Sequence, residues 1–338
     1  MISHTCKEFI TKLPKAELHV HIEGTMEPEQ MIAIAERNKI KIPAGVLDSS
    51  GNYLFSGYEE FIKTYIQATS VLCQEQDFYD ITLAYLKKVA GQGVLRTEIF
   101  FDLQTYFSRN ITPEIIINGM YTAFIEGKKR YHIDAAMIMC FIRNFSEENA
   151  FKALNLLQEY KDKVIGVGLA SLEDNNPPIK FEHVFARARA QGYHLVGHAG
   201  ESGTEHIRDM ITKLHCERID HGVGCMYDPS LVQELAQLKI PMTVCPLSNV
   251  KLGIFKTLHE HPIKKMFDAG LNISINSDDP AFFGSYIADN YLAAQSLGFS
   301  CRDLITCAGN GLQAAFVSEE IKKAYQVKLD EYSAGHAC

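Results

Sequence analysis

Residues 164–198 read VIGVGLASLEDNNPPIKFEHVFARARAQGYHLVGH, and this stretch decides the fold. It begins with a continuous apolar run over 164–171 and ends with another over 193–198. Apolar runs of this kind are typical of strands that are buried on both faces of a parallel sheet. Between the two runs, residues 181–191 have the apolar spacing of an amphipathic helix. The stretch therefore predicts two parallel strands joined by a crossover helix.

The same alternation continues on both sides of this unit. Helical spacing also marks 145–160 and 229–238, where Ser146 and the pair Asp228-Pro229 are typical helix starts. In all, eight short apolar segments end in polar or charged residues: 16–22, 93–102, 132–143, 164–171, 193–198, 218–222, 241–247 and 271–278. Eight strands that alternate with helices predict a (β/α)₈ barrel of the TIM type.

Two regions exceed a minimal barrel. Residues 26–90 are too many for one crossover and contain several helical patterns, which predicts a helical insertion after the first strand. Residues 286–338 predict two or more further helices, mainly over 286–330. Neither region has a linker rich in Gly, Ser or Pro, so we expect one domain over 1–338.

Composition narrows the class of partner. The 338 residues are 46% hydrophobic and 22% charged, which is typical of a globular protein. The formal charge of −8 leaves no broad basic field for nucleic acid or an anionic membrane. No apolar stretch approaches the ~20 residues of a membrane span. We therefore expect a small-molecule substrate, no nucleic acid and no membrane; a homo-oligomer is compatible with the sequence.

The cysteines and the amino terminus bear on the compartment. Nine cysteines are scattered without a Cys-x-x-Cys pair, which predicts free thiols in a reducing compartment. The first residues, MISHTCKE, lack the charged start and apolar run of a secretory signal. We expect a cytoplasmic location.

The first predicted strand carries a candidate metal motif. Its alternation places His19, His21 and Glu23 on one face. Two neutral imidazoles at this spacing can share a cation such as Zn²⁺. By itself, a His-x-His pair more often belongs to a strand whose polar face meets solvent than to a metal site.

More candidate ligands follow the ends of other predicted strands: His198, Glu201, His221, Asp278 and Asp279. In a barrel these strand ends converge on one face, where active sites are built. Three imidazoles and one carboxylate, from His19, His21, His198 and Asp278, would hold one ion and leave room for a water. Zinc lowers the pKa of such a water, giving hydroxide near neutral pH.

The remaining polar residues have predicted roles around that ion. Glu201 lies three residues beyond a ligand, where a carboxyl group suits proton transfer to a substrate. His221 would orient the hydroxide, and Asp279 would turn toward the substrate while its neighbour binds the metal. Asp220 is interpreted as a supporting or structural carboxylate.

Five motifs resemble those of the adenosine and adenine deaminase family: PKAELHVHIEGT at 14–25, GHAGE at 197–201, RIDHG at 218–222, CPLSN at 245–249 and SDDP at 277–280. They follow the family's order and span most of the chain. The resemblance implies a zinc barrel with the four ligands above, a catalytic Glu201 and a hydroxide-orienting His221. It implies attack of zinc-bound hydroxide at purine carbon 6, protonation of ring nitrogen 1 by Glu201, and loss of ammonia. Asp279 would face nitrogen 7.

The resemblance is greater to the adenine deaminase branch. Glu23 stands where adenosine deaminases have an aspartate that helps to hold ribose, and its extra methylene would bring the carboxylate toward nitrogen 9. TEIFFD at 97–102, NNPPIKF at 175–181 and SDDPAFFG at 277–284 are similar to the same branch. The expected reaction is therefore adenine to hypoxanthine and ammonia, in purine salvage.

Some positions depart from that branch. Leu103 and Tyr106 replace its proline and histidine, and Ala170 replaces a carboxylate. Ala170 and the expected substrate contact Ser171 belong to the segment that meets the nitrogen 3 edge of the purine in the family. Adenosine, or another purine substituted at carbon 6, therefore remains an alternative substrate.

The sequence lacks the features expected of two other classes of protein. A catalytically silent relative would lack a metal ligand or the glutamate at 201, and all are present. Hydrolases of amides or phosphoesters with this barrel often bind two metals through a carboxylated lysine on a middle strand. The run over 164–171 ends without a lysine.

Overall fold

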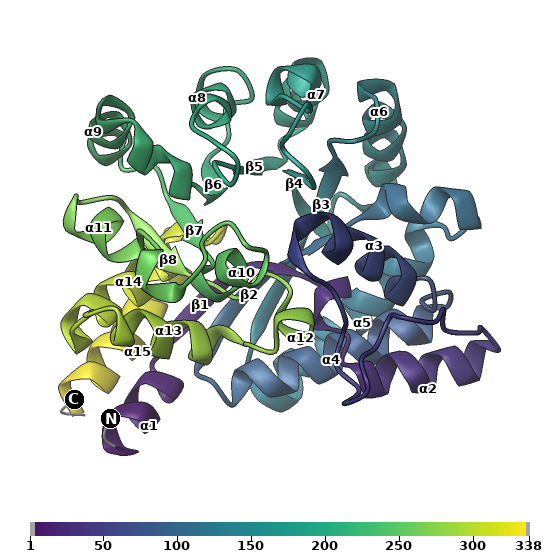
Figure 1. The fold of residues 1–338 in the computed structure, drawn as a ribbon, viewed down its shortest axis with the longest axis horizontal. Helices are drawn as coiled ribbons and strands as arrows, with labels where there is room; N and C mark the ends of the chain where they lie inside the picture. Colours follow the sequence, from purple (N-terminus) through teal and green to yellow (C-terminus); the bar gives the residue numbers. More distant parts are fainter. Residues whose placement is uncertain (1–3, 336–338) are drawn as a thin grey trace.

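The computed structural model describes residues 4–335, which form an eight-stranded parallel barrel surrounded by helices (Figure 1). The strands are hydrogen-bonded in chain order: β1 (Lys15–His21), β2 (Val94–Phe101), β3 (Asp134–Ile142), β4 (Val164–Ala170), β5 (His194–Ala199), β6 (Arg218–His221), β7 (Met242–Val244) and β8 (Ile273–Ile275). A parallel bridge between Val20 and Asp278 joins the last strand region to the first. The predicted (β/α)₈ barrel is confirmed.

The strands match the predicted segments, with β7 and β8 shorter than expected. The segment 241–247 was expected to be strand throughout, but Pro246 begins the helix α10 (Pro246–Lys251). Proline favours the first position of a helix because its missing N–H would have no helical partner there. β8 ends at Ile275, and three residues later Asp278 has a left-handed φ of 70°. Both strands therefore end early, and the residues that follow them turn toward the barrel mouth.

Helices cover the outside of the barrel. They are α5 (Pro113–Tyr131), α6 (Glu147–Leu156), α7 (Glu182–Ala190), α8 (Glu205–Thr212), α9 (Pro229–Leu238) and α11 (Ile263–Asp268). Short 3-10 helices lie in the loops: η1 (Glu23–Thr25), η2 (Leu103–Arg109), η3 (Leu157–Tyr160), η4 (Pro178–Phe181), η5 (Val223–Tyr227) and η6 (Leu258–Glu260). The predicted helix starts are confirmed, since Ser146 accepts a hydrogen bond from Asn149 and Asp228 accepts two from the first turn of α9.

The region 26–90 contains α2 (Pro28–Asn38), α3 (Gly57–Thr69) and α4 (Glu75–Ala90). α4 packs against α5 and β2 as an ordinary crossover helix, so α2 and α3 are the additional elements. After β8 come α12 (Pro280–Phe283), α13 (Ile287–Ser296), α14 (Cys301–Ala314) and α15 (Glu319–Gly335). α14 packs on β1 and β8, and α13 packs on the unpredicted first helix, α1 (His4–Lys12).

A buried ionic cluster lies inside the barrel, below the mouth. Glu98 is fully buried and accepts hydrogen bonds from Arg218 (2.8 Å), Arg96 (3.1 Å) and the backbone N–H of Phe316 (2.7 Å). Burial raises the pKa of Glu98, but the two guanidinium groups lower it more, so its pKa lies below the ordinary value. This carboxylate therefore remains charged and links β2 to β6 across the interior.

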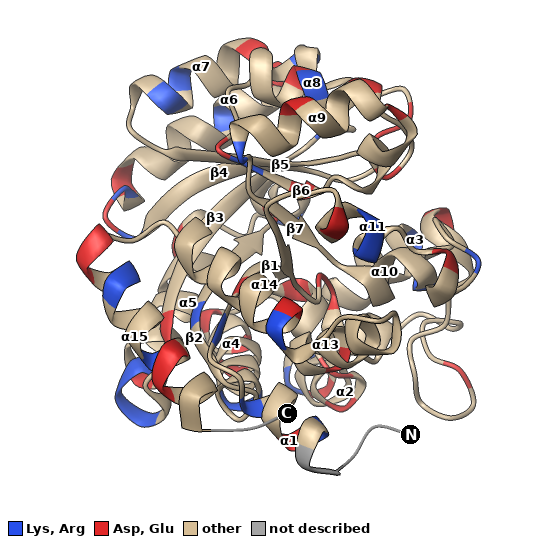
Figure 2. Ribbon diagram, turned by 90° about the vertical axis from the view of Figure 1, so that its left-hand side faces the viewer, with Lys and Arg blue, Asp and Glu red and all other residues tan. Residues whose placement is uncertain are grey.

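The outer helices carry charges of both signs. Figure 2 shows acidic and basic residues interspersed along α8 and α15, and neither sign forms a continuous field in that view. Between residues 4 and 335, no helix is long and apolar enough to cross a membrane.

Six cysteines are free thiols: Cys73, Cys140, Cys216, Cys225, Cys245 and Cys307. All but Cys73 are buried, so they pack as small apolar residues. For these six residues the prediction of free thiols is confirmed. Cys301 is disulfide-bonded, so for that residue the prediction is wrong. Cys338 lies outside the described residues.

Candidate active site

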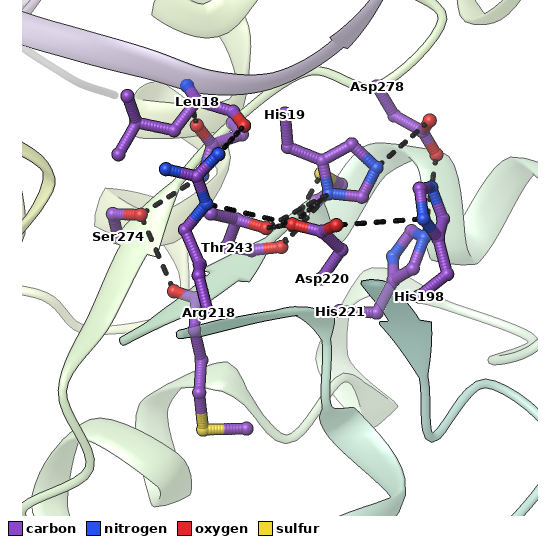
Figure 3. Close-up of polar contacts among 12 residues, drawn as sticks. Leu18, His19, His198, Arg218, Asp220, His221, Thr243, Ser274 and Asp278 are labelled. Atoms are coloured by element: carbon purple, nitrogen blue, oxygen red, sulfur yellow. Dashed lines mark hydrogen bonds and ion pairs between the residues drawn. The ribbon is translucent and has the colours of Figure 1, made fainter. Parts of the chain in front are cut away.

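The carboxyl ends of four strand regions bring three histidines and an aspartate together. His19 lies on β1, His198 on β5, His221 at the end of β6, and Asp278 follows β8. One ligand atom from each lies within 4.8 Å of the others, and all four residues are buried. Figure 3 shows His19 between Asp278 on one side and Asp220 and Thr243 on the other. The convergence predicted from the sequence is therefore present.

His21 joins the same cluster from the next inward position of β1. Its Nε2 atom lies 3.1 Å from Nε2 of His198 and 3.6 Å from Oδ1 of Asp278. All four predicted ligands thus meet. His221, which was expected to orient hydroxide, lies in the cluster as well.

Hydrogen bonds on the far side of each ring determine what the cluster offers a metal. Nδ1 of His19 faces the carbonyl oxygen of Thr243 (3.3 Å) and its hydroxyl oxygen (3.1 Å), and that hydroxyl donates to Asp220 (2.7 Å). Both partners can only accept from His19, so Nδ1 carries the proton and Nε2 presents a lone pair. Nε2 of His19 is buried without a hydrogen-bond partner, 3.3 Å from Oδ1 of Asp278.

The same reasoning applies to His198. Its Nδ1 atom donates to the carbonyl oxygen of Leu169 (3.0 Å), which leaves Nε2 as a lone pair beside Nε2 of His21. Burial lowers the pKa of His21 to about 4 and that of His198 well below its ordinary value, so both rings are neutral. Burial also lowers the pKa of His19, but Asp278 and Asp220 raise it more, so a cation at its Nε2 atom would take the place of a proton that these carboxylates favour. Neutral imidazole lone pairs directed at a buried carboxylate oxygen are a donor set that fits a borderline divalent cation such as zinc.

Glu201 stands beside this cluster on the turn after β5. Its Oε1 atom is buried without a hydrogen-bond partner and lies 3.5 Å from Nε2 of His221. Burial raises the pKa of Glu201 well above its ordinary value, and the nearby carboxylates of Glu173 and Asp278 raise it further. A buried carboxyl group whose protonated form is favoured in this way is suited to donate a proton.

Glu173 fixes the turn that carries Glu201. Its carboxylate accepts hydrogen bonds from the backbone N–H groups of Gly200 (2.7 Å), Glu201 (3.0 Å) and Ser202 (2.9 Å). One carboxylate thus satisfies three consecutive donors of a buried turn. This role of Glu173 could not be predicted from local spacing, because its partners are 27 to 29 residues away in the chain.

A chain of side chains sets the proton position on His221. The backbone N–H of Ile263 donates to Nδ1 of His261 (3.2 Å), so the proton of that neutral ring is on Nε2, which donates to Oδ1 of Asn249 (3.0 Å). Burial lowers the pKa of His261 to about 3, which keeps the ring neutral. The amide nitrogen of Asn249 then donates to Nδ1 of His221 (3.2 Å). His221 therefore carries its own proton on Nε2, the atom that faces Glu201.

The two aspartates after β8 have different surroundings. Asp278 turns to the histidines and accepts a hydrogen bond from Ser248 (2.6 Å). Asp279 lines the neighbouring cavity, and its Oδ1 atom is buried without a partner. Burial raises the pKa of Asp279 well above its ordinary value, with Asp278 adding to the effect. A Cβ on Gly24 would lie 1.9 Å from Oδ1 of Asp279, so only glycine leaves room for this carboxyl group.

A cavity of about 90 Å³ opens over the cluster. Its outer wall comes from α3, through Tyr58, Phe61 and Tyr65. Ser171, an expected substrate contact, lines it with a left-handed φ of 80° and donates to Asn144 (2.7 Å).

Glu23, the other expected substrate contact, lies behind this cavity. It is buried, and Oε1 accepts hydrogen bonds from the hydroxyl of Tyr106 (2.9 Å) and the backbone N–H of Asp102 (3.2 Å). Tyr65 lies 3.5 Å from its other oxygen. Tyr106, one of the departures from the adenine branch, is therefore a partner of Glu23, whereas Ala170 lines the cavity itself.

Comparison with known proteins gives a family to which this geometry corresponds. A family model described as adenosine deaminase matches residues 14–332. The chain belongs to the adenosine deaminase family. The resemblance drawn from the five motifs is thereby confirmed, and this family member has its candidate ligands at the strand ends that those motifs occupy.

Relatives of this adenosine deaminase family member carry a more specific name. It is 46% identical over 321 residues to a protein named adenine deaminase from Chlorobium phaeobacteroides (strain BS1), with 94% of this chain and 96% of the relative covered. It is 47% identical over 324 residues to an adenine deaminase from Geotalea uraniireducens (strain Rf4), with coverage of 95% and 91%. The crystal structure of an adenine deaminase from Arthrobacter aurescens matches with a TM-score of 0.91 and 39% identity, over 95% of this chain and 99% of that chain.

Proposed function

We propose that this chain is a zinc-dependent adenine deaminase, which hydrolyses adenine to hypoxanthine and ammonia in cytoplasmic purine salvage. One zinc ion per chain would be held by His19, His21, His198 and Asp278 in a single domain. The observation that carries the proposal is the Oε1 atom of Glu201, which is buried without a hydrogen-bond partner. It lies beside the cluster formed by His19, His198, His221 and Asp278. The names of the relatives support adenine as the substrate.

Each residue has a distinct task. A bound zinc ion would supply a strong nucleophile at neutral pH by lowering the pKa of water. His221, with its proton on Nε2, donates a hydrogen bond toward the attacking oxygen and orients it. Asp279 contacts nitrogen 7, and Glu201 transfers a proton to nitrogen 1, which makes carbon 6 more electrophilic.

The balance of the reaction requires one water molecule. Its oxygen bonds to carbon 6, and the bond between carbon 6 and the amino nitrogen breaks. One proton of the water ends on nitrogen 1 of hypoxanthine, and the other leaves with the amino group as ammonia. Glu201 lines the cavity, and its Oε1 atom lies 3.5 Å from Nε2 of His221. Asp278 also lines the cavity but lies farther from that nitrogen (3.9 Å) and is a proposed metal ligand, so we assign the proton relay to Glu201.

Ammonia release from a panel of purines tests this proposal. Adenine, adenosine and N6-methyladenine are each incubated with the purified chain, whose zinc content is measured on the same sample. We expect about one zinc per chain and the highest kcat/KM with adenine. Much faster turnover of adenosine would identify the alternative substrate, and two metals per chain would contradict the single-ion site.

A further inference from the structure

Asp102 is a buried carboxylate that the proposed mechanism does not use. It follows the last residue of β2, is 7% exposed and lines the cavity. Its Oδ1 atom is buried and has no hydrogen-bond partner among residues 4–335; the nearest basic nitrogen, Nδ1 of His21, is 4.0 Å away. Burial raises the pKa of Asp102 well above its ordinary value, and the nearby Glu23 raises it further. A buried carboxyl oxygen without a donor costs free energy, so a group of this kind in a cavity wall is suited to a ligand that supplies the missing donor.

Glu23 supports Asp102 from behind. Its Oε1 atom accepts the backbone N–H of Asp102 (3.2 Å) and the hydroxyl of Tyr106 (2.9 Å). Thr105, on the same short helix, donates its hydroxyl to the carbonyl oxygen of Asp102 (2.7 Å). The backbone of Asp102 is thus fixed on both sides, while its side chain stays free.

The order of strands around the mouth places Asp102 relative to a purine. Asp279 follows β8, Asp102 follows β2, Ser171 follows β4 and Glu201 follows β5, and the strands are neighbours in chain order. Going around adenine in one direction, nitrogen 7 is followed by nitrogen 9, nitrogen 3 and nitrogen 1. If Asp279 contacts nitrogen 7 and Glu201 nitrogen 1, the nitrogen that faces the β2 position is nitrogen 9.

We propose that the carboxylate of Asp102 accepts a hydrogen bond from the imidazole N–H of a free purine base, and that it selects bases without a substituent at nitrogen 9. This inference rests on the proposed function, since it uses the orientation set by Asp279 and Glu201. A nucleoside has no N–H at nitrogen 9, and its sugar would meet the unpaired carboxylate. Glu23 is a positioning residue in this arrangement, because its Oε1 atom accepts from Tyr106 and from the backbone of Asp102 and its side chain does not line the cavity.

Asp102→Ala and Asp102→Asn are the variants that test this contact. Each is also made in the Glu201→Gln background, where calorimetry measures adenine binding without turnover. Removing the acceptor leaves a buried N–H of the base without a partner, which is expected to weaken adenine binding about 10- to 100-fold in the alanine variant. Binding of 9-methyladenine, which has no N–H at nitrogen 9, should change less than about 3-fold. Asp102→Asn keeps the size of the side chain, so it remains informative if the alanine variant does not fold.

The controls separate this inference from its alternatives. Asp174→Asn removes an exposed carboxylate from the loop after β4 and should change neither affinity. Zinc content should equal that of the parent, since a role through His21 would lower metal binding instead. Equal losses for adenine and 9-methyladenine, or reduced zinc, would overturn the assignment of Asp102. Absence of ammonia release from adenine by the unmodified chain would contradict the proposed function itself, which the binding data do not depend on.

Discussion

The side-chain amide of Asn249 donates to Nδ1 of His221 across 3.2 Å, and it is the only partner of that ring nitrogen among the described residues. Because the chain of hydrogen bonds begins at the backbone N–H of Ile263, none of its members can reverse direction without leaving a buried group unpaired. The backbone after η6 thereby determines which nitrogen of His221 carries the proton.

Asn249→Asp tests that chain. It replaces a donor by an acceptor of the same size, so the proton of His221 should move to Nδ1 and Nε2 should lose its ability to donate. We expect kcat to fall on the order of 10²-fold or more, as expected when a catalytic histidine is held in the wrong tautomer, with KM and zinc content little changed. Asn272→Asp, at a partly exposed site, is the matched control. Unaltered kcat would show that the tautomer of His221 does not matter.

Glu201→Gln tests the proton relay. The glutamine keeps the shape of the side chain but cannot transfer a proton, so kcat should fall by roughly 10²- to 10⁴-fold. Zinc content should remain at the level of the unmodified chain, because Glu201 is not one of the four ligands. A variant that retains most of its turnover would exclude Glu201 as the proton donor.

Glu173→Gln tests the support of the catalytic turn. An amide group has only one acceptor oxygen, so part of the set of N–H groups from Gly200 to Ser202 would lose its partner. We expect the free energy of unfolding to fall by about 1–3 kcal/mol. We also expect kcat to fall, because the side chain of Glu201 is no longer held in place. The neighbouring Asp174→Asn is exposed and should change stability by less than about 0.5 kcal/mol.

Metal removal should lower the thermal stability of the chain. Without a cation, the lone pairs of His19 and His198 and the carboxylate of Asp278 remain buried without their partner, whereas binding stabilises only the folded state. At a free zinc concentration of about 100 times Kd, the expected gain is about 2.7 kcal/mol, visible as a rise in Tm when zinc is returned to the chelated protein. His19→Ala should lose that rise together with the zinc. A chelated protein with unchanged Tm would argue against a bound metal.

Because of the ionic cluster around Glu98, the free energy of unfolding should depend on pH in the acid range. The folded pKa of Glu98 lies below its ordinary value, so its contribution is present above the unfolded pKa of ~4.3 and is lost as the pH falls through the folded value. Glu98→Gln should remove this part of the acid dependence, which chemical denaturation between pH 3 and 6 measures. It should also lower stability at neutral pH by about 3–5 kcal/mol, since Arg218 would remain buried without its carboxylate.

Much of the barrel could be predicted because its signals are local. The apolar runs that form β4 and β5 are continuous, and the pair Asp228-Pro229 fixes the first residue of α9, whose bounds the structure reproduces as 229–238. β7 was predicted too long, because hydrophobicity continues through Pro246 into α10. The first helix, α1, was not predicted. It is stabilised by tertiary contacts with α13, which sequence periodicity does not reveal.

In the candidate site, too, some residues could be predicted from local sequence and others could not. Residues at strand ends, such as His198 and Asp278, follow apolar runs directly, and the structure brings them together as the barrel topology requires. The supporting residues could not be found from spacing. His261 acts through Asn249 on His221, and Asp102 is marked only by the absence of a partner. Such relationships become visible only when distant segments have folded against each other.

Three residues at the mouth, Ser171, His221 and Asp278, adopt left-handed backbone angles of 80°, 66° and 70°. For residues with a side chain, that conformation costs about 1–2 kcal/mol relative to the usual one, whereas glycine tolerates it freely. Backbone conformation alone would therefore favour glycine at all three positions. At Asp278 glycine would delete a proposed metal ligand, and at His221 it would delete a proposed catalytic imidazole. Library or consensus designs for higher thermal stability should leave these positions unchanged, because here a substitution that stabilises the backbone would lower activity.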